Sequence, residues 1–372
     1  MAAATHLVYF CDWLPPDFGA VGQYALIRAR EFAATGRQVT LYGLSSTQDS
    51  VVEERTATGS LRVVRLKAAT YDRTSLAQRA WWTARTNIRL VVHAWRDLRA
   101  CGEILFTGSP PLMLHVLAPL NILLRRKLVY RITDFFPEAM IAAMPQVPGI
   151  MRLLQRLTVF WRRRIDRFEV LGEDQRARLA AQGVRPERIA LVRDPSPVTI
   201  GPDTRPLTLP EPLRGRKVLL YSGNFGVAHE YETFVEAYEK HHRAGSGKVV
   251  LWLNAVGAGA DAVQRQLTSR NLPYLRTQPM PLDRVASLLV TPDAHLITLR
   301  AAFAGVVVPS KVFGCIESGR DIIYIGPSES DVHLLCKSKK ASGLYSRVEI
   351  GDVAGLLRVL EELAESRAGV RS

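Results

Sequence analysis

Short apolar runs alternate with longer segments of helical periodicity along almost the whole chain. The runs are rich in β-branched and aromatic residues, which strands prefer. In the first half they are residues 6–10, 38–44, 61–66, 103–106, 128–132, 168–171 and 189–192, and in the second half 217–221, 248–253, 294–298 and 322–325. Strands separated by helical patterns indicate parallel sheets with crossover helices. The predicted fold class is therefore α/β, with a last helix at 353–365.

Residues 193–215 interrupt this alternation. The segment holds six prolines and two glycines, so it continues neither a helix nor a central strand. A chain of 372 residues also exceeds what one hydrophobic core usually organises. We therefore expect two Rossmann-like domains, 1–195 and 216–372, joined by a linker at 196–215. Two such sheets that face each other leave a cleft at the carboxyl ends of their strands, where open α/β sheets bind ligands.

The segment 306–320, VVVPSKVFGCIESGR, predicts a buried strand at 306–308 and then a short helix capped by Ser310. In such a helix Ser310 and Glu317 share one face and lie about 10 Å apart along the axis. Free amides at the helix start and the charge of Lys311 would face a diphosphate, and Glu317 would accept hydrogen bonds from a ribose. The alternative is an ordinary turn between a strand and a helix, with Glu317 in solvent.

Two loops of the first half follow predicted strands and carry residues suited to ligand binding. Gly19 and Gly22 precede a predicted helix at 23–34, and glycines there would let a substrate approach the backbone closely. Asp134 comes directly after the strand 128–132, where it would orient a hydroxyl group or stabilise developing positive charge. In both cases the alternative is structural, a tight turn or a cap.

The loop after the strand 217–221 carries a similar pattern. Gly223 and Asn224 suit a backbone cradle for phosphate, and His229 would add positive charge. The alternative is a histidine that only forms a hydrogen bond near a helix start. A later turn, Gly257-Ala258-Gly259, resembles a dinucleotide turn, but it lacks the third glycine and the acidic residue that NAD binding requires.

Composition and charge limit the classes of partner. Apolar residues make up 47% and charged residues 23% of the chain, as in a folded soluble protein. The formal charge is +14, and residues 1–200 hold 28 Lys and Arg against 17 Asp and Glu, a net charge of +11. A basic surface of this kind fits an anionic membrane, nucleic acid or a phosphorylated substrate.

Several sites and locations are disfavoured. The four cysteines lie far apart and without CxxC spacing, which speaks against zinc and disulfides and suits the cytosol. There is no Walker loop, HExxH, GxSxG or DxD motif, so we predict no bound metal and no cofactor. Neither a signal peptide nor a membrane-spanning run is visible. The predicted location is the cytoplasm, with peripheral attachment to the inner face of the cell membrane as an extension.

Taken in order, these motifs make the whole chain resemble a known family. The glycine loop, DFFPE at 134–138, SGNFG at 222–226 and PSK at 309–311 are similar to motifs of the family 4 retaining glycosyltransferases of GT-B fold. The similarity is to the branch of bacterial transferases that build polysaccharides or glycolipids. The chain departs from the family at Pro309, where the first of two paired glutamates usually stands, and in the loop of Asn224 and His229, where Arg and Lys are usual.

The resemblance implies a reaction and a set of site residues. A sugar would move from a nucleotide-diphosphate donor to a hydroxyl of a saccharide or lipid-linked acceptor, with retained anomeric configuration and without a metal. Cationic groups would stabilise the departing diphosphate. The implied catalytic residues are Asp134, Arg300 and Lys311, and the implied donor-binding residues are Gly19, Gly22, Gly223, Asn224, His229, Gln278, Met280, Ser310, Val312, Phe313 and Glu317. Val312 and Phe313 would act through their amides, and the segment from Gln278 to Met280 would contact the base.

Two segments of the first half bear on the acceptor. Apolar residues recur at helical spacing through Trp81, Ile88 and Trp95, and again through Ile150 and Leu157, with arginines off each stripe. Either these helices pack on the core with a solvated basic face, or they form a surface that rests on anionic lipid. The second interpretation leads to the prediction of a lipid-linked acceptor and an anionic membrane surface as partner.

Three other functions remain open at this point. A nucleotide-sugar epimerase shares the fold but uses no acceptor. A nucleic-acid-binding protein would use the basic half, although no RNP-like, helix-turn-helix or zinc pattern supports it. A protein that binds a nucleotide sugar without turning it over would fit the absence of the first paired glutamate.

Overall fold

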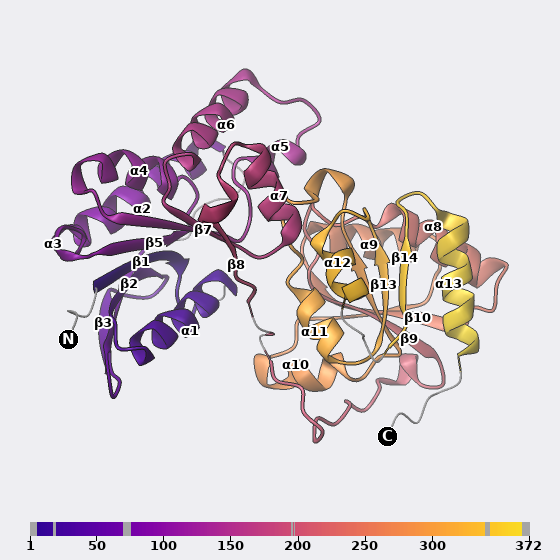
Figure 1. Ribbon diagram of the computed structural model, residues 1–372. Helices are drawn as coiled ribbons and strands as arrows, with labels where there is room; N and C mark the ends of the chain where they lie inside the picture. The colour runs from indigo at the N-terminus through magenta and orange to yellow at the C-terminus, as the bar shows by residue number, and fades with distance from the viewer. Residues whose placement is uncertain are drawn as a thin grey trace. The chain divides into compact units, whose positions relative to one another are not determined.

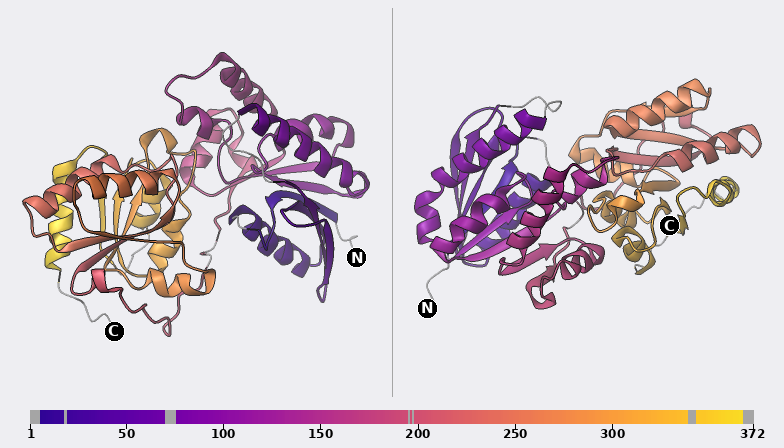
Figure 2. Two further views of the ribbon diagram at one scale, coloured as in Figure 1. Left: turned by 180° about the vertical axis from the view of Figure 1, so that it is seen from behind. Right: turned by 90° about the horizontal axis from the view of Figure 1, so that it is seen from above.

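The computed structural model describes residues 6–17, 20–69, 76–194, 196, 198–338 and 343–366. The chain forms two compact units, Met1–Asp194 and Pro195–Ser372, called unit 1 and unit 2 below. Each unit contains one mainly parallel sheet with helices on both faces, so the predicted α/β class is confirmed (Figures 1 and 2).

Unit 1 is built on an eight-stranded sheet in the order β3-β4-β2-β1-β5-β6-β7-β8. Its strands are β1 His6–Trp13, β2 Gln38–Ser45, β3 Ser50–Arg55, β4 Ser60–Lys67, β5 Glu103–Thr107, β6 Lys127–Ile132, β7 Arg167–Val170 and β8 Ile189–Leu191. All neighbours pair in parallel except β3, which pairs antiparallel with β4. The sequence pattern did not reveal β3, because its residues Val51 and Val52 are exposed on an edge strand and no buried face marks it.

The helices of unit 1 connect its strands and cover both faces of its sheet. They are α1 Ala20–Ala34, α2 Leu76–His93, α3 Trp95–Ala100, α4 Met113–Leu124, α5 Glu138–Ala142, α6 Gly149–Arg162 and α7 Glu173–Ala181. Leu7 and Tyr9 of β1 point to the face covered by α1, where they pack on Ala25 and Ala29. On the other face Tyr42 of β2 donates a hydrogen bond to Asp97 of α3.

Unit 2 repeats this plan with a six-stranded sheet in the order β11-β10-β9-β12-β13-β14. Its strands are β9 Lys217–Asn224, β10 Val249–Val256, β11 Tyr274–Thr277, β12 Ala294–Thr298, β13 Asp321–Ile325 and β14 Tyr345–Val348. Its helices are α8 Glu232–Arg243, α9 Ala258–Ser269, α10 Leu282–Leu289, α11 Lys311–Glu317, α12 Asp331–Ser338 and α13 Val353–Glu365. Leu219 and Leu251 pack against α8, α9 and α13, whereas Val218 and Trp252 pack against α10.

The proline-rich segment lies at the start of unit 2. Within residues 198–216 the structure contains only the short 3-10 helix Glu211–Leu213. Leu207 and Leu209 pack against the unit 2 core, and the Leu207 amide donates to Thr291 at 2.8 Å. The second part of the segment is therefore attached to the unit 2 sheet.

The strand predicted at 306–308 is wrong. The amides of Val306 and Val307 both donate to the carbonyl of Phe303, at 3.0 and 3.2 Å, which makes this run a turn. Val306 and Val308 are nevertheless buried. The short β-branched run therefore predicted burial correctly, but the strand predicted from it is not formed.

The apolar stripes predicted in α2 and α6 do not generally face the core. Trp81 and Ile88 of α2 and Leu153 of α6 are exposed. The buried residues of α6 are Thr158 and Arg162. The core-packing interpretation of these stripes is therefore wrong for most of their residues.

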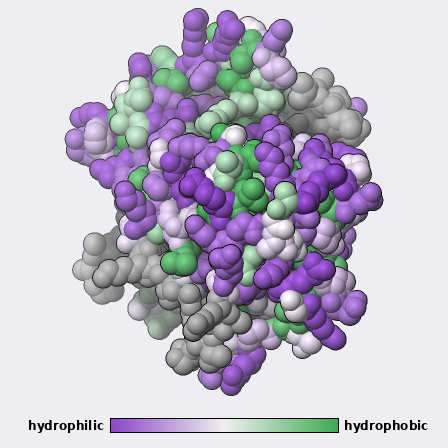
Figure 3. Space-filling view, turned by 90° about the vertical axis from the view of Figure 1, so that its right-hand side faces the viewer, coloured by the Kyte–Doolittle hydropathy of each residue, from purple (hydrophilic) through white to green (hydrophobic). Residues whose placement is uncertain are grey.

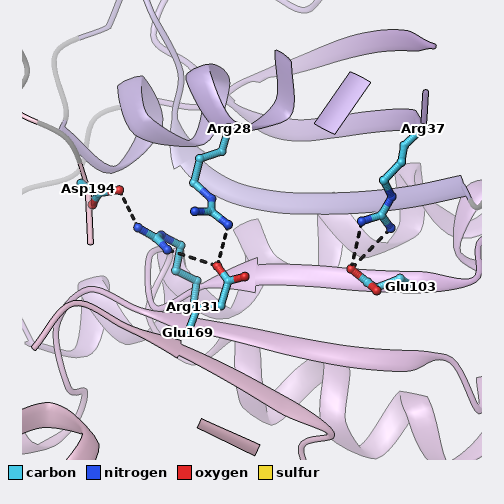
Figure 4. Close-up of polar contacts among 6 residues, drawn as sticks. All are labelled: Arg28, Arg37, Glu103, Arg131, Glu169 and Asp194. Carbon is cyan, nitrogen blue, oxygen red and sulfur yellow. Dashed lines mark hydrogen bonds and ion pairs between the residues drawn. The ribbon is translucent and has the colours of Figure 1, made fainter. Parts of the chain in front are cut away.

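A buried charge network ties the end of unit 1 to its sheet (Figure 4). Arg131 of β6, whose side chain is 2% exposed, binds Glu169 of β7 at 3.1 Å and also pairs with Asp194. Arg28 of α1 binds the same Glu169 oxygen at 2.9 Å. Because each charge has an opposite partner, the network avoids the high cost of an isolated ion in the interior.

We expect Arg131→Met to lower the free energy of unfolding of unit 1 by about 3–5 kcal/mol, because it leaves Asp194 buried without its cation. The matched control is Arg30→Met, which removes the exposed Arg30–Glu54 pair and should cost about 0–1 kcal/mol. Urea unfolding of the three proteins tests this. Equal stability of the two variants would contradict the structural role of the network.

Candidate functional site

Five side chains meet at the carboxyl ends of two neighbouring strands in unit 2. β9 and β12 pair in parallel, so their carboxyl ends lie at the same sheet edge. Tyr221 comes from β9, Thr298 ends β12, and His229 lies in the loop between β9 and α8. Arg300 follows β12, and Lys311 begins α11. We call Tyr221, His229, Thr298, Arg300 and Lys311 the Lys311 cluster.

The amine of Lys311 is the unusual group of this cluster. Its Nζ is buried, has no hydrogen-bond partner among the described residues, and lies 3.4 Å from the centre of the Tyr221 ring. Loss of hydration lowers the pKa of Lys311 to about 7. The ring favours the ammonium by about 0.5–2 kcal/mol, whereas burying an unpaired ion costs several kcal/mol. Desolvation therefore dominates, and the charged form of the amine has no compensating anion among the described residues.

His229 does not supply the predicted positive charge. Its Nδ1 lies 2.7 Å from the carbonyl oxygen of Thr298, so Nδ1 carries a proton and donates it to that oxygen. Burial, and then the neighbouring Lys311, lower the pKa of His229 to about 3. The Oγ1 of Thr298 is also buried without a partner among the described residues. The cluster thus offers a neutral imidazole and a hydroxyl beside Lys311.

Arg300 is the second cation of the cluster. Its backbone amide donates to Ala228 at 2.8 Å, and its Nε donates to the carbonyl of His229 at 3.2 Å. The guanidinium pairs with Glu232 at 3.0 Å, and both side chains are largely exposed. Because exposed pairs contribute little stability, an anionic ligand can compete for this guanidinium.

The loop after β9 is shaped by glycines. Gly223 has a φ of +102°, a conformation that favours glycine. A Cβ at Gly257 would lie 2.6 Å from Asn224 Oδ1, and one at Gly259 would lie 2.7 Å from the carbonyl of Phe225. The glycines of the suspected dinucleotide turn therefore serve close packing of this loop. Asn224 itself is exposed.

The predicted phosphate contacts through the amides of Val312 and Phe313 are contradicted. The Val312 amide donates to Pro309 at 3.0 Å and the Phe313 amide to Ser310 at 3.3 Å. Both amides are used within the turn and are not free for a ligand. Ser310 occupies the position before α11 but forms no capping hydrogen bond through its side chain.

The predicted ligand face of α11 is only partly exposed. Ser310 and Glu317 are exposed at its two ends, but Phe313 and Gly314 between them are buried. A Cβ at Gly314 would lie 2.8 Å from Leu289 of α10, so this part of the face packs on a helix. Only the ends of α11 are therefore available to a ligand.

The segment proposed to contact a base has two different environments. Gln278 is exposed, and its carbonyl accepts a hydrogen bond from the buried Asn254 at 2.6 Å. Met280 packs against the core cluster that contains Trp252 and Leu288. Gln278 is therefore the more accessible of the two residues.

In unit 1, the glycine loop is described only in part. Gly19 lies outside the described residues. Gly22 is buried in the first turns of α1, and a Cβ there would lie 1.8 Å from the carbonyl oxygen of Trp13. Close packing of α1 on β1 therefore explains this glycine, and its side-chain position is not open to a substrate.

The segment after β6 divides into an exposed acid and a buried one. Asp134 is exposed, as a residue that meets an acceptor must be. Glu138 is buried and pairs with Arg162 of α6, whose guanidinium also donates a hydrogen bond to Gln182 Oε1 at 2.9 Å. Glu138 thus anchors this loop, a role that sequence reasoning did not assign.

The chain is similar in sequence to a bacterial protein named as a probable glycosyltransferase. No protein-family model matches the sequence. The chain is 24% identical over 276 residues to the probable glycosyltransferase WbjE of Pseudomonas aeruginosa, across 71% of this chain and 66% of WbjE, slightly less than two thirds of that protein.

Solved structures cover nearly the whole chain. Sucrose-phosphate synthase from Thermosynechococcus elongatus has a TM-score of 0.70 at 13% identity, over 96% of this chain and 89% of that one. HepE of Anabaena, in complex with UDP and glucose, has a TM-score of 0.61 at 12% identity, over 97% and 90%. The chain has the GT-B fold. This confirms the fold that the motifs predicted.

Within this GT-B fold, sequence reasoning missed two members of the Lys311 cluster. Tyr221 ends the predicted part of β9 and Thr298 ends β12, where alternation indicates core residues. No local signal distinguishes an aromatic ring that packs in the core from one that contacts an amine.

Among the helices that the structure describes in this GT-B chain, none has the length and apolar character needed to span a membrane.

We expect the ring signals of His229 to stay unchanged between about pH 5 and pH 8, because its pKa is lowered to about 3. In the unfolded chain a histidine binds a proton near pH 6.5. Its contribution to the stability of unit 2 is therefore present above about pH 6.5 and is lost as the pH falls toward 3. NMR titration, with His229→Gln for assignment, measures this. A midpoint between about pH 5.5 and pH 7.5 would refute the neutral assignment.

Proposed function

We propose that the protein is a glycosyltransferase that moves a sugar from a nucleoside-diphosphate sugar to a hydroxyl group of a saccharide or a lipid-linked acceptor. The proposal is supported by the GT-B fold, by the similarity to WbjE, and by UDP and glucose in the HepE structure. The observation that carries it is the Lys311 amine at the carboxyl ends of the unit 2 strands, buried without a counter-ion among the described residues.

The donor diphosphate binds at the Lys311 cluster in this proposal. Arg300 contacts the backbone carbonyl of His229 at 3.2 Å, and Lys311 lies near enough to lower the pKa of the His229 ring. Cleavage of the bond between sugar and phosphate leaves additional negative charge on the diphosphate. Two cations at this place stabilise the departing group more than the bound donor, which lowers the barrier.

We further propose that the anomeric configuration is retained and that no metal is needed. Lys311 and Arg300 supply the positive charge that a metal supplies in other transferases. Asp134 is exposed in unit 1 and is assigned to orient the acceptor hydroxyl. Product configuration measured by NMR, in buffer with a chelator, tests both statements.

Donor binding is the first test. In a thermal-shift screen with UDP-, GDP-, dTDP- and ADP-sugars, at least one donor should raise the melting temperature, because it binds only the folded state. Lys311→Met should weaken binding by about 1.5–3 kcal/mol, the contribution of a charged hydrogen bond. The control Lys240→Met changes an exposed lysine of α8 and should respond like the wild type.

Two results would redirect this proposal. If Lys311→Met responds like the wild type to every donor, the assigned site is wrong. If the protein converts a nucleotide sugar into its epimer without an acceptor, it is an epimerase. Neither result depends on knowing the natural acceptor.

We also propose that unit 1 rests on an anionic membrane, which places it near a lipid-linked acceptor. α4 packs against both α2 and α6. These helices and α3 expose large apolar side chains, which are Trp81, Ile88, Val92, Trp95, Ile122, Leu123, Ile150, Leu153, Leu157 and Phe160. By contrast, the side of the molecule that carries α8 and α13 is mostly hydrophilic, with apolar residues in small groups (Figure 3).

Several arginines lie close to the exposed apolar side chains of α6. Arg152, Arg156, Arg163 and Arg164 of α6 and its end line a hollow of about 720 Å³. Arg164 lies 3.6 Å from the centre of the Phe160 ring, so charge and aromatic surface are adjacent. Apolar side chains that enter the interface and arginines that meet phosphate head groups together favour an anionic lipid surface.

We expect the protein to bind vesicles of phosphatidylcholine and phosphatidylglycerol at low salt, and pure phosphatidylcholine vesicles much less. A triple change, Leu153→Gln, Leu157→Gln and Phe160→Gln, should reduce binding at least about tenfold, because it removes apolar surface that the membrane buries. Leu282→Gln, at an exposed leucine of α10, is the control. Failure of anionic vesicles to retain the wild type in flotation at low salt would end this part of the proposal.

A further inference from the structure

We propose that Lys311 takes up a proton when the donor diphosphate binds, so that the cation of this site is completed only in the complex. The inference rests on the proposed function and assigns to one residue a linkage between donor binding and pH. Its basis is the position of the Lys311 amine, which faces the Tyr221 ring. The amine has neither an anion nor a hydrogen-bond acceptor among the described residues.

The groups around the amine provide no counter-charge. They are Tyr221 of β9, His229 of the following loop, Cys315 of α11 and, behind it, Cys336 of α12. Burial keeps the pKa of Cys315 and of Cys336 raised to about 12, so both thiols stay protonated and neutral. His229 is neutral because burial, and then Lys311, lower its pKa to about 3. These four groups are therefore uncharged near neutral pH, and the remaining charged member of the cluster, Arg300, is itself a cation that pairs with Glu232.

A diphosphate changes this balance. It brings the negative charge that the buried amine lacks, and an opposite charge within a few ångström favours the protonated amine. Lys311 as a residue is only partly buried, although its Nζ atom is fully covered. Its side chain can therefore rotate toward solvent. The step transfers one proton from buffer to the Nζ lone pair, and no bond between heavy atoms changes.

Isothermal titration calorimetry in two buffers measures the number of protons that the protein takes up when the donor binds. The probes are UDP-glucose, GDP-mannose, dTDP-glucose and ADP-glucose, whose diphosphate esters keep a constant charge near neutral pH. Titration at about pH 8 in HEPES and in Tris gives the number of protons from the difference in heat. With a free pKa of about 7, uptake should be about 0.9 proton at pH 8 and about 0.1 at pH 6.

Three variants identify the group that takes up the proton. Lys311→Arg keeps a permanent charge and should bind without uptake, because arginine does not lose its proton in this range. Lys311→Met should weaken binding about tenfold or more and abolish uptake. His229→Gln should retain uptake, since His229 is assigned as neutral in both states. Far-UV circular dichroism verifies that each variant is folded.

The outcomes separate this inference from the proposed function. A probe that binds with uptake, lost in both Lys311 variants and kept in His229→Gln, supports both. Binding without uptake in the wild type, or uptake lost in His229→Gln and kept in Lys311→Met, overturns the inference and leaves the donor site standing. If no probe binds at all, the proposed function fails and the inference fails with it.

Discussion

The central constraint is the buried amine of Lys311, which has no anionic partner among the described residues. Lys311 Nζ rests 3.4 Å from the Tyr221 ring and is covered from solvent, and its position depends on the fold of unit 2. The parallel pairing of β9 and β12 brings Tyr221, His229 and Thr298 to one sheet edge, and α11 places Lys311 against them. A folded chain that leaves such a group uncompensated is arranged for a ligand that brings negative charge.

The other buried cations of the protein show why Lys311 is distinctive. Arg131 is held between Glu169 and Asp194, and Arg162 is held by Glu138 and Gln182. Both arginines are compensated within unit 1 and stabilise its architecture, one at the end of the unit and one under the loop of Asp134. Burial alone therefore does not mark a functional charge in this molecule. The marker is burial combined with the lack of a partner among the described residues.

Much of the fold followed from periodicity, and the site followed only in part. Apolar runs identified β1, β2 and β9 because each contains a stretch of consecutive buried residues, whereas the edge strand β3 is largely exposed. A core-facing helix was one of two interpretations of the α6 stripe, yet the buried residues of α6 are Thr158 and Arg162. Motif order brought Arg300, His229 and Lys311 together correctly. It did not reveal that His229 is neutral or that the Val312 amide is already bonded, because these properties depend on partners distant in sequence or on turn geometry.

The most direct test of this account is a crystal structure with a bound nucleoside-diphosphate sugar. The account predicts that a phosphate oxygen lies about 3 Å from Lys311 Nζ, with the Lys311 side chain turned away from the Tyr221 ring. A nucleotide bound elsewhere, with Lys311 still resting on Tyr221, would contradict it.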